Sequence, residues 1–312
     1  HNRERRIPHV RTVMREIYRK RVETLLESLP YIRMFSGSTM VIKYGGAAMS
    51  SADLKEEFAT DIALLRYVGI RPIIVHGGGN EISNYMQRLD LPVKFVEGLR
   101  VTDAATMEVA KMVLVGKVNK EIVSLINSKG APAVGLCGDD GLLLRARPLV
   151  KKSQDGGVLE LGLVGEVTEV NVELMALLEA DYVPVVASVG AGDDGQSYNI
   201  NADTVAGALA AALKAEKVIF LTDVIGLLTD LEDDSSLISE CTGDEVKRLM
   251  DAGKVSKGMI PKLEAVLMSL KGGVRAAHII DGRIAHSVLL EILTDDAGLG
   301  TKIVPVRHPA SA

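Results

Sequence analysis

Short apolar, β-branched runs alternate with longer stretches of helical periodicity from Thr39 onward, and this alternation restricts the fold more than any other feature. A repeated strand–helix–strand order requires crossover connections, which place helices on both faces of a mainly parallel sheet. We therefore expect an α/β fold, a three-layer αβα sandwich. The expected strands are Thr39–Tyr44, Pro72–His76, Ala133–Leu136, Tyr182–Ser188, Lys217–Thr222 and Ala277–Ile280. The expected helices are Asp53–Tyr67, Glu81–Leu89, Ala104–Asn127, Val172–Glu179, Ala202–Lys214, Gly243–Ala252 and Leu263–Leu270.

Two segments in the middle of the chain break this alternation. Leu142–Pro148 and Val158–Val170 lie between glycine-rich turns, a pattern that predicts hairpin strands at an edge of the sheet. The glycine-rich run at 190–195 then precedes a new series of strands and helices, so we place a boundary near 190–205. The expected units are an N-terminal extension (1–35), a first lobe (36–200) and a second lobe (201–312).

The first 35 residues have a different character. Residues 1–21 hold eight basic and two acidic side chains, and their apolar positions follow the spacing of one helix face. That stripe is formed by Val10, Val13, Met14, Ile17, Tyr18, Leu25 and Leu26, and we expect Pro30 to end the helix. An apolar stripe of this kind must be buried against another surface. Contact with another subunit is favoured over docking on the chain's own body or on a membrane surface.

Composition excludes several classes of protein. The chain carries 36 Lys and Arg against 41 Asp and Glu, a net charge of −5, so no nucleic-acid partner is expected. Cys137 and Cys241 lie far apart, which excludes a zinc-ligand spacing or a disulfide scaffold and suits a reducing compartment. No apolar run approaches the length of a membrane span, and because the first Met is Met14, any targeting peptide is expected to lie outside this sequence.

Ligands of open parallel sheets bind at the carboxyl ends of the strands, so residues just after each strand are candidates. Lys43 ends the first strand and is followed by Tyr44, Gly45 and Gly46, which indicates either a phosphate cradle or a tight turn with a solvated lysine. The second strand ends at His76 before three glycines at 77–79, which expose backbone N–H groups to an anion or form a flexible loop. Neither segment is a P-loop or a GxGxxG motif.

Three further positions carry candidate chemistry. Lys262 follows Pro261 at the start of a helix, where the helix dipole disfavours a cation unless an anion such as phosphate lies nearby. The stretch 199–203 opens a helix with two Asn and one Asp, which could orient lysines and a substrate or only cap the helix. Arg100 could grip a carboxylate or lie on the surface. A Ser–His–Asp hydrolase is poorly supported because no GxSxG motif occurs.

Together these motifs resemble the amino acid kinase family, from about Thr39 to the C-terminus. The resemblance rests on residues 43–46, 76–79, 97–102, 199–203, 221–224 and 258–262, in this order. Within the family the chain is most similar to kinases that act on N-acetyl-L-glutamate. The resemblance implies transfer of a phosphoryl group from ATP, carrying Mg²⁺ on its phosphates, to a side-chain carboxylate in arginine biosynthesis. A carboxylate acceptor is already ionised, which agrees with the lack of an evident general base.

The family pattern assigns roles to individual residues. Lys43 and Lys262 would flank the transferred group, and Asp203 would orient both lysines. Substrate binding is expected at Gly78, Gly79, Arg100, Asn199 and Asn201. Nucleotide binding is expected at Lys43, Gly45, Gly46, Thr222, Asp223, Gly226, Leu227, Leu228, Val255, Ser256, Lys257, Gly258, Met259 and Lys262, and no protein metal site is expected. The first lobe would bind the acceptor and form dimers, and the second would bind ATP and arginine.

The N-terminal helix, followed by residues 29–31, resembles the arginine-inhibited members of the family. In those members such helices join dimers into a homo-hexamer, a trimer of dimers. Their inhibitory arginine site matches Tyr31, His278, Glu291 and Gly298 here. The chain is most similar to the oxygenic photosynthetic branch, which implies the PII signalling protein as a partner and the plastid stroma as the location. The cytoplasm of a cyanobacterium or another bacterium is the alternative.

Other functions stay open at this point. Another kinase of the family could act on glutamate, aspartate, carbamate or UMP, but Arg100 and Asn199 favour an acceptor with an α-carboxylate, which counts against carbamate and UMP. No further C-terminal regulatory domain follows, which counts against an aspartokinase. A non-catalytic sensor of nucleotide and arginine is a second alternative, and the presence of both Lys43 and Lys262 counts against it.

Overall fold

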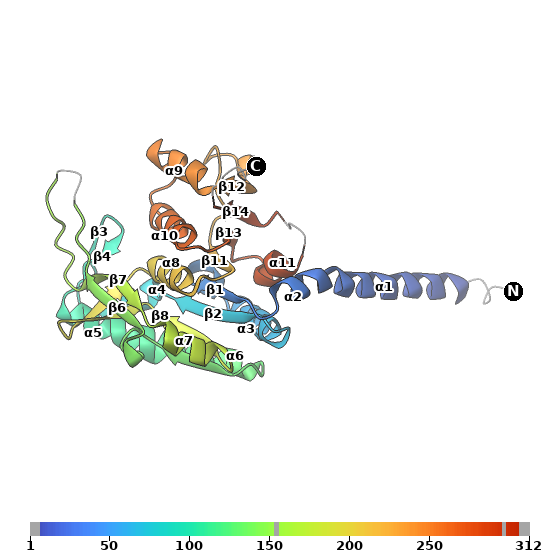
Figure 1. Cartoon of the computed structure of the whole chain (residues 1–312), viewed down its shortest axis with the longest axis horizontal. Helices are drawn as coiled ribbons and strands as arrows, with labels where there is room; N and C mark the ends of the chain where they lie inside the picture. Colours follow the sequence, from blue (N-terminus) through green and yellow to red (C-terminus); the bar gives the residue numbers. More distant parts are fainter. Residues whose placement is uncertain (1–6, 153–155, 295–297, 306–312) are drawn as a thin grey trace, which may run out of the picture.

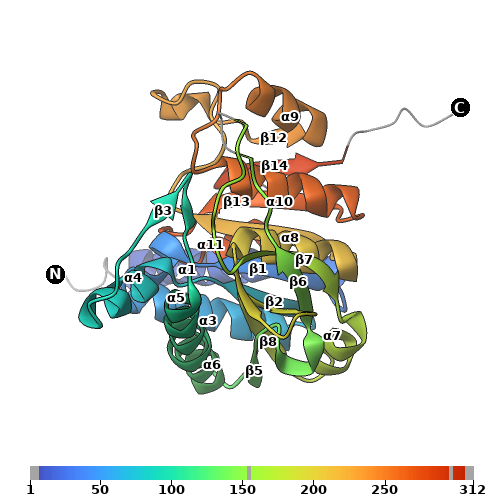
Figure 2. The ribbon, with the colours of Figure 1, turned by 90° about the vertical axis from the view of Figure 1, so that its left-hand side faces the viewer.

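The computed structural model describes residues 7–152, 156–294 and 298–305. Within them, eight strands form one sheet in the order β12-β14-β13-β11-β1-β2-β8-β5 (Figures 1 and 2). The strands are β12 (Glu240–Thr242), β14 (Gly300–Val304), β13 (Ala276–Asp281), β11 (Lys217–Thr222), β1 (Thr39–Tyr44), β2 (Arg71–His76), β8 (Val183–Ala187) and β5 (Ala133–Leu136). All neighbours pair in parallel except β13 and β14, so the prediction of a mainly parallel sheet is confirmed.

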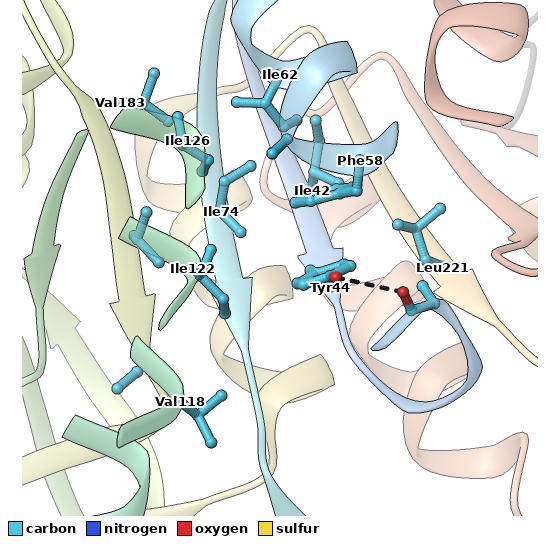
Figure 3. Packing of buried hydrophobic residues seen from close by; sticks show 14 of the residues in the cluster. Ile42, Tyr44, Phe58, Ile62, Ile74, Val118, Ile122, Ile126, Val183 and Leu221 are labelled. Carbon is cyan, nitrogen blue, oxygen red and sulfur yellow. Dashed lines mark hydrogen bonds between the residues drawn. The ribbon is translucent and has the colours of Figure 1, made fainter. Parts of the chain in front are cut away.

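Helices cover both faces of this sheet, which confirms the three-layer sandwich. On one face lie α3 (Ala52–Tyr67), α6 (Asn119–Ser128) and α11 (Ser287–Leu293), and on the other lie α7 (Val172–Glu179), α8 (Ala202–Leu213), α9 (Gly243–Asp251) and α10 (Ile260–Lys271). Successive residues of β1 point to opposite faces, as strand geometry requires. Val41 therefore packs with the core under α8 and α10, and Ile42 packs with Phe58 and Ile62 of α3 (Figure 3).

The predicted helix Ala104–Asn127 is one helical path with an irregular centre. It consists of α5 (Ala104–Lys111), the π-helical segment η2 (Met112–Val118) and α6. Asp103 caps its start by accepting a hydrogen bond from the Thr106 N–H at 2.8 Å. The remaining short elements are η1 (Gly46–Met49), α4 (Gly79–Arg88), β3 (Phe95–Val96), β4 (Leu99–Arg100), η3 (Asp140–Leu142) and η4 (Asp234–Ser236).

The predicted hairpin strands exist, but their placement at an edge of the main sheet is wrong. β6 (Leu144–Pro148) and β7 (Val164–Val170) pair antiparallel and close a small barrel with β9 (Val189–Gly192) and β10 (Ser197–Ile200). The barrel closes because its glycines allow close approach: a Cβ on Gly165 would lie 2.5 Å from Tyr198 Cβ. Sequence periodicity does not predict β9 and β10. The glycine-rich run 190–195 overlaps β9 and indicates a boundary, and the end of β10 falls in the stretch 199–203 that was expected to open a helix.

The N-terminal extension forms two helices, α1 (Ile7–Glu27) and α2 (Leu29–Phe35), and α1 extends away from the sheet (Figure 1). Pro30 does not end a single helix as predicted but lies in the first turn of α2, where its missing N–H costs no hydrogen bond. In the predicted stripe, Tyr18, Leu25 and Leu26 are exposed, so docking on the chain's own body is wrong for them. The side chains of Val10, Val13, Met14 and Ile17 lie outside the described part of the structure. Among the helices described, none has the length and apolar character needed to cross a membrane.

Candidate active site

Two lysines and one aspartate from three separate elements meet at the carboxyl edge of the sheet. Lys43 lies near the end of β1, Asp203 in the first turn of α8 and Lys262 in the first turn of α10. Lys43 Nζ lies 3.1 Å from Asp203 Oδ1, and Lys262 Nζ lies 3.0 Å from Asp203 Oδ2. Each carboxylate oxygen therefore faces one ammonium group, and the structure brings the three predicted residues together.

Local sequence explains how α8 and α10 bring Asp203 and Lys262 into contact. Asn201 caps α8, since its Oδ1 accepts hydrogen bonds from the backbone N–H of Asp203 at 2.8 Å and of Thr204 at 3.3 Å. A Cβ on Gly207 would lie 2.7 Å from the carbonyl oxygen of Ala265, so only glycine permits the observed spacing of α8 and α10. The capping role proposed as an alternative for Asn201 is therefore present in the structure.

The electrostatics of this centre favour an anion. Burial alone would raise the pKa of Asp203, but Lys43 and then Lys262 hold that pKa below its ordinary value, so the carboxylate stays ionised. Burial lowers the pKa of Lys262, and Asp203 opposes the shift. Two ammonium groups against one carboxylate leave a net positive charge in a largely buried setting. Such a centre suits negatively charged phosphoryl oxygens.

A cavity of about 190 Å³ lies beside the centre. Its lining comes from the Gly77–Gly79 segment, the β3–β4 hairpin, β10 and the start of α8, and it includes Gly78, Gly79, Arg100, Asn199 and Asn201. All five predicted substrate-binding residues therefore share one cavity. Their chemistry, backbone N–H groups with one guanidinium and two amides, suits a small ligand that carries a carboxylate and an amide.

Arg100 is not the surface arginine considered as an alternative. Only 7% of the residue is exposed, and its Nη2 donates hydrogen bonds to the Gly79 carbonyl at 2.7 Å and to Ser83 Oγ at 2.8 Å. The guanidinium also lies over the ring of Phe95, 4.7 Å from its centroid. Burial lowers the pKa of Arg100, although an arginine stays charged under all ordinary conditions. The side chain is thus pre-positioned at the wall of the cavity.

Two glycines of the predicted loops have a local reason to be glycine, Gly78 a steric one and Gly46 a conformational one. A Cβ on Gly78 would lie 2.8 Å from Leu114 Cδ2, so the segment before α4 packs tightly and is not a flexible loop. A Cβ on Gly45 would meet Lys43 Nζ at 3.6 Å, and Gly46 has a φ of +60° with open space above it. Gly45 and Gly46 therefore leave the approach to the Lys43 ammonium free of side chains.

His76 lies directly before the three glycines at 77–79, and its burial makes the stability of the folded protein depend on pH in the acidic range. It is fully buried; its Nε2 accepts a hydrogen bond from Asn119 Nδ2 at 3.0 Å, and its Nδ1 donates to the Gly77 carbonyl at 2.9 Å. Burial lowers the pKa of His76 to about 4, so the folded state binds fewer protons than the unfolded state between that pH and 6.5. Stability should therefore fall by up to about 3 kcal/mol as the pH falls through this window.

Chemical unfolding of the wild type and His76→Gln at several pH values measures this loss. The stability advantage of the wild type over the variant should shrink as the pH falls from 6.5 to 4. A constant difference across that range would show that His76 is not a buried neutral histidine.

A second cavity, of about 350 Å³, lies beyond β11 and next to the start of α10. Of the predicted nucleotide-binding residues, it is lined by Asp223, Gly226, Leu227, Leu228, Val255, Ser256 and Met259. Thr222, Lys257 and Gly258 are not among its lining residues; the Thr222 hydroxyl instead donates to the Val224 carbonyl at 2.8 Å. Sequence analysis missed Leu231, Asp234 and Arg283. The feature that could have identified Arg283 is its position just after a strand. The sequence predicts an end of that strand at Ile280, which is too early to bring Arg283 into consideration.

Comparison with known proteins fits this arrangement. A model described as the Amino acid kinase family matches residues 38–281. The chain belongs to the amino acid kinase family. An acetylglutamate kinase of Synechococcus is 56% identical over 291 residues, which cover 93% of this chain and 91% of the relative. The chloroplastic acetylglutamate kinase of Arabidopsis thaliana is 56% identical over 284 residues, covering 91% of this chain and 80% of the relative.

The fold likeness extends to solved structures of other proteins. N-acetylglutamate synthase from Neisseria gonorrhoeae, complexed with coenzyme A and N-acetyl-glutamate, matches with a TM-score of 0.79 at 25% identity. The match covers 92% of this chain and 64% of that one, so this amino acid kinase chain spans less than two thirds of the synthase.

A third cavity of this amino acid kinase, of about 360 Å³, lies where α2 meets β11, β13 and α11. Tyr31, His278 and Glu291 line it, as the predicted arginine site requires, but Gly298 is not among its lining residues. His278 Nδ1 lies 2.5 Å from Glu291 Oε1, and His278 Nε2 is buried without a hydrogen-bond partner in the described part of the chain. Sequence analysis missed Lys217, which also lines this cavity.

A metal site on the protein itself was not expected. Over the ranges 7–152, 156–294 and 298–305, no group of three or more His, Cys, Asp or Glu side chains is arranged to hold a metal ion.

Proposed function

We propose that this amino acid kinase transfers the γ-phosphoryl group of ATP to the side-chain carboxylate of N-acetyl-L-glutamate, a reaction of arginine biosynthesis. The observation that carries the proposal is the Lys43–Asp203–Lys262 centre. Ala202, the neighbour of Asp203, lines the 190 Å³ cavity with the buried arginine, and Met259, one turn before Lys262, lines the 350 Å³ cavity. The named activity of relatives that are 56% identical over most of the chain supports the same reaction.

In this reaction a carboxylate oxygen of the acceptor forms a bond to the γ-phosphorus while the bond from that phosphorus to the β,γ-bridging oxygen breaks. The bridging oxygen keeps the electron pair, and ADP leaves without any proton transfer. Lys43 and Lys262 stabilise the negative charge on the phosphoryl oxygens as the bonds change. Asp203 holds the two ammonium groups apart and oriented, so they need not reorganise during the reaction.

The acceptor cavity supplies the positioning. We assign Arg100 to the α-carboxylate of the substrate, together with the amides of Gly78 and Gly79 and the side chain of Asn199. Asn201 orders the start of α8 behind them. Holding both reactants in line is a large part of catalysis where the chemistry itself needs no base.

For the nucleotide we propose the second cavity, with the predicted residues of β11 and the start of α10. Gly45, Gly46, Lys257 and Gly258 would contact the phosphates at its rim. ATP enters as its magnesium complex, and the ion neutralises part of the phosphate charge. The carboxylate of Asp223 lines the cavity and has the oxygen chemistry that Mg²⁺ prefers.

We also propose that arginine inhibits the enzyme by binding in the third cavity. Tyr31, His278 and Glu291 would contact it, and we keep Gly298 as a candidate through its backbone. A guanidinium suits the carboxylate of Glu291, and the buried His278 Nε2 suggests a polar ligand. We propose a role for each of the three units. Residues 36–200 bind the acceptor and form dimers, residues 201–312 bind ATP and arginine, and residues 1–35 join the dimers into the larger assembly.

The homo-hexamer is proposed from the resemblance of the sequence, and the extended helix α1 supports association between copies of the chain. Tyr18, Val22, Leu25 and Leu26 expose between 52% and 73% of their surface on a helix that extends from the body, and a second copy of the chain could cover them. Similarity to plant and cyanobacterial relatives supports the plastid stroma or a cyanobacterial cytoplasm as the location. The PII signalling protein remains a proposed partner on the resemblance of the sequence alone.

Deletion of residues 1–28 should leave turnover close to wild type, dissociate the larger assembly into smaller ones and weaken inhibition by arginine. Sedimentation velocity and inhibition curves measure these effects. The double variant Leu25→Asp/Leu26→Asp should behave like the deletion, while the exposed polar control Arg21→Asp should not. An unchanged sedimentation profile after deletion would refute the role assigned to α1.

An ATP-dependent turnover assay tests the function directly. ADP release is measured with N-acetyl-L-glutamate, glutamate, aspartate, carbamate and UMP as acceptors, with and without arginine. We expect turnover with N-acetyl-L-glutamate and much less with the others. A clear preference for another acceptor would identify that acceptor as the substrate. The absence of turnover with every acceptor would favour a sensor that binds nucleotide without catalysis.

A further inference from the structure

Arg283 lies at the same edge of the sheet as the lysine pair. It follows β13, whose neighbour β11 leads to Asp223, and β11 in turn pairs with β1, which carries Lys43. Arg283 and Asp223 both line the 350 Å³ cavity. The ends of three adjacent strands therefore place charged side chains along one line, from the proposed nucleotide cavity to the Lys43–Asp203–Lys262 centre.

A buried carboxylate holds the Arg283 guanidinium in place. Arg283 Nε donates to Asp281 Oδ1 at 2.9 Å and Nη2 donates to Oδ2 at 2.7 Å, while the Arg283 backbone N–H donates to Oδ1 at 2.9 Å. Asp281 is only 5% exposed, whereas the Arg283 side chain is 52% exposed. These bonds occupy Nε and Nη2, so the fork is fixed at one side while Nη1 takes no part in the pair.

Charges of opposite sign alternate along this line. Asp203 lies between Lys43 and Lys262, and Asp223 acts electrostatically on both Lys262 and Arg283. A triphosphate that starts in the nucleotide cavity and ends at the two lysines must pass along this row. Its transferred phosphate would meet the lysines, and its other phosphates would meet the part of the row that contains Arg283.

We propose that Arg283 is a further cation of the nucleotide site, which binds the non-transferred phosphates of ATP and so places the γ-phosphate between Lys43 and Lys262. Asp281 is its positioning residue. This inference rests on the proposed function in one respect, since it takes the 350 Å³ cavity as the nucleotide site. It does not depend on which acceptor is phosphorylated.

The test compares nucleotide affinities with the full-length protein. Calorimetric titrations with ATP, ADP and adenosine are run on the wild type, Arg283→Gln and the matched control Arg147→Gln. Arg147 is also an exposed arginine paired with a carboxylate, Glu166, at 2.6 Å, but it lies on β6 in the barrel. We expect Arg283→Gln to weaken ATP and ADP binding by about tenfold, with adenosine unchanged and the control unaffected.

Two variants and the kinetics sharpen the test. Arg283→Lys, which keeps the charge, should recover part of the lost affinity, and Asp281→Asn should lose less than Arg283→Gln because only the orientation is relaxed. In the ADP-release assay KM for ATP should rise while KM for the acceptor stays constant. An unchanged ATP affinity in Arg283→Gln, an equal loss for adenosine, or no ATP binding by the wild type would overturn the proposal. If ATP binds the wild type and binds Arg283→Gln more weakly as expected, but N-acetyl-L-glutamate is not turned over, only the proposed function would be rejected.

Discussion

Replacing Lys43 or Lys262 with alanine should lower kcat by about 100- to 1,000-fold, which corresponds to about 3–4 kcal/mol of lost transition-state stabilisation. In the proposed reaction each lysine supplies one of the two ammonium groups that face the transferred phosphoryl group, and water cannot replace a fixed charge in a largely buried site. KM for the acceptor should change much less, because the charge acts mainly as the bonds change.

Single-turnover and steady-state kinetics measure this effect. Lys247→Ala, which removes an exposed lysine from α9, is the matched control and should keep wild-type turnover. Near wild-type kcat in either Lys43→Ala or Lys262→Ala would remove the proposed role of that lysine. The centre would then be a structural ion network.

Asp203→Asn should affect both stability and activity. It leaves two buried ammonium groups facing each other without the carboxylate that compensates them, a situation that destabilises folded proteins by about 3–5 kcal/mol. The pKa of Lys262, already lowered by burial, should fall further because Asp203 no longer opposes that shift. Turnover should fall as well, since the lysines lose their orientation.

The double variant Asp203→Asn/Lys262→Met separates the two effects. Removing one ammonium group relieves the repulsion, so this variant should recover much of the lost stability but none of the lost activity. Urea unfolding measures the stability and the ADP-release assay measures the activity. Stability of Asp203→Asn equal to that of the wild type would show that the three groups are less coupled than their 3.0 and 3.1 Å contacts indicate.

Sequence patterns predicted the sandwich well because each buried strand of a parallel sheet is a short β-branched run with a clear boundary. The same rule placed Lys43 at a strand end, and the dipole argument for Lys262 pointed to a nearby anion. In the structure that anion is the carboxylate of Asp203, which leaves the centre as a whole still positive. The convergence of the two lysines was carried by family resemblance, because spacing along the chain does not encode distance in space.

The barrel and Arg283 show where sequence reasoning failed. Closure of the barrel depends on the close approach allowed by glycines such as Gly165, and in the missed strand β9 the glycines Gly190 and Gly192 remove the alternation that marks a strand. Arg283 was missed because β13 runs to Asp281, one residue beyond the apolar run. In both cases the decisive contact is made across the fold, and nothing in the local pattern reports it.

Two neighbouring strands each span the distance between two cavities. Lys217 and His278, on β11 and β13, line the cavity beside α2, while Asp223 and Arg283, just past the other ends of these strands, line the cavity beside α10. A hydrogen-bonded pair of strands resists compression and stretching along its length. The two cavities therefore share one pair of hydrogen-bonded strands, with one cavity towards each end of the pair.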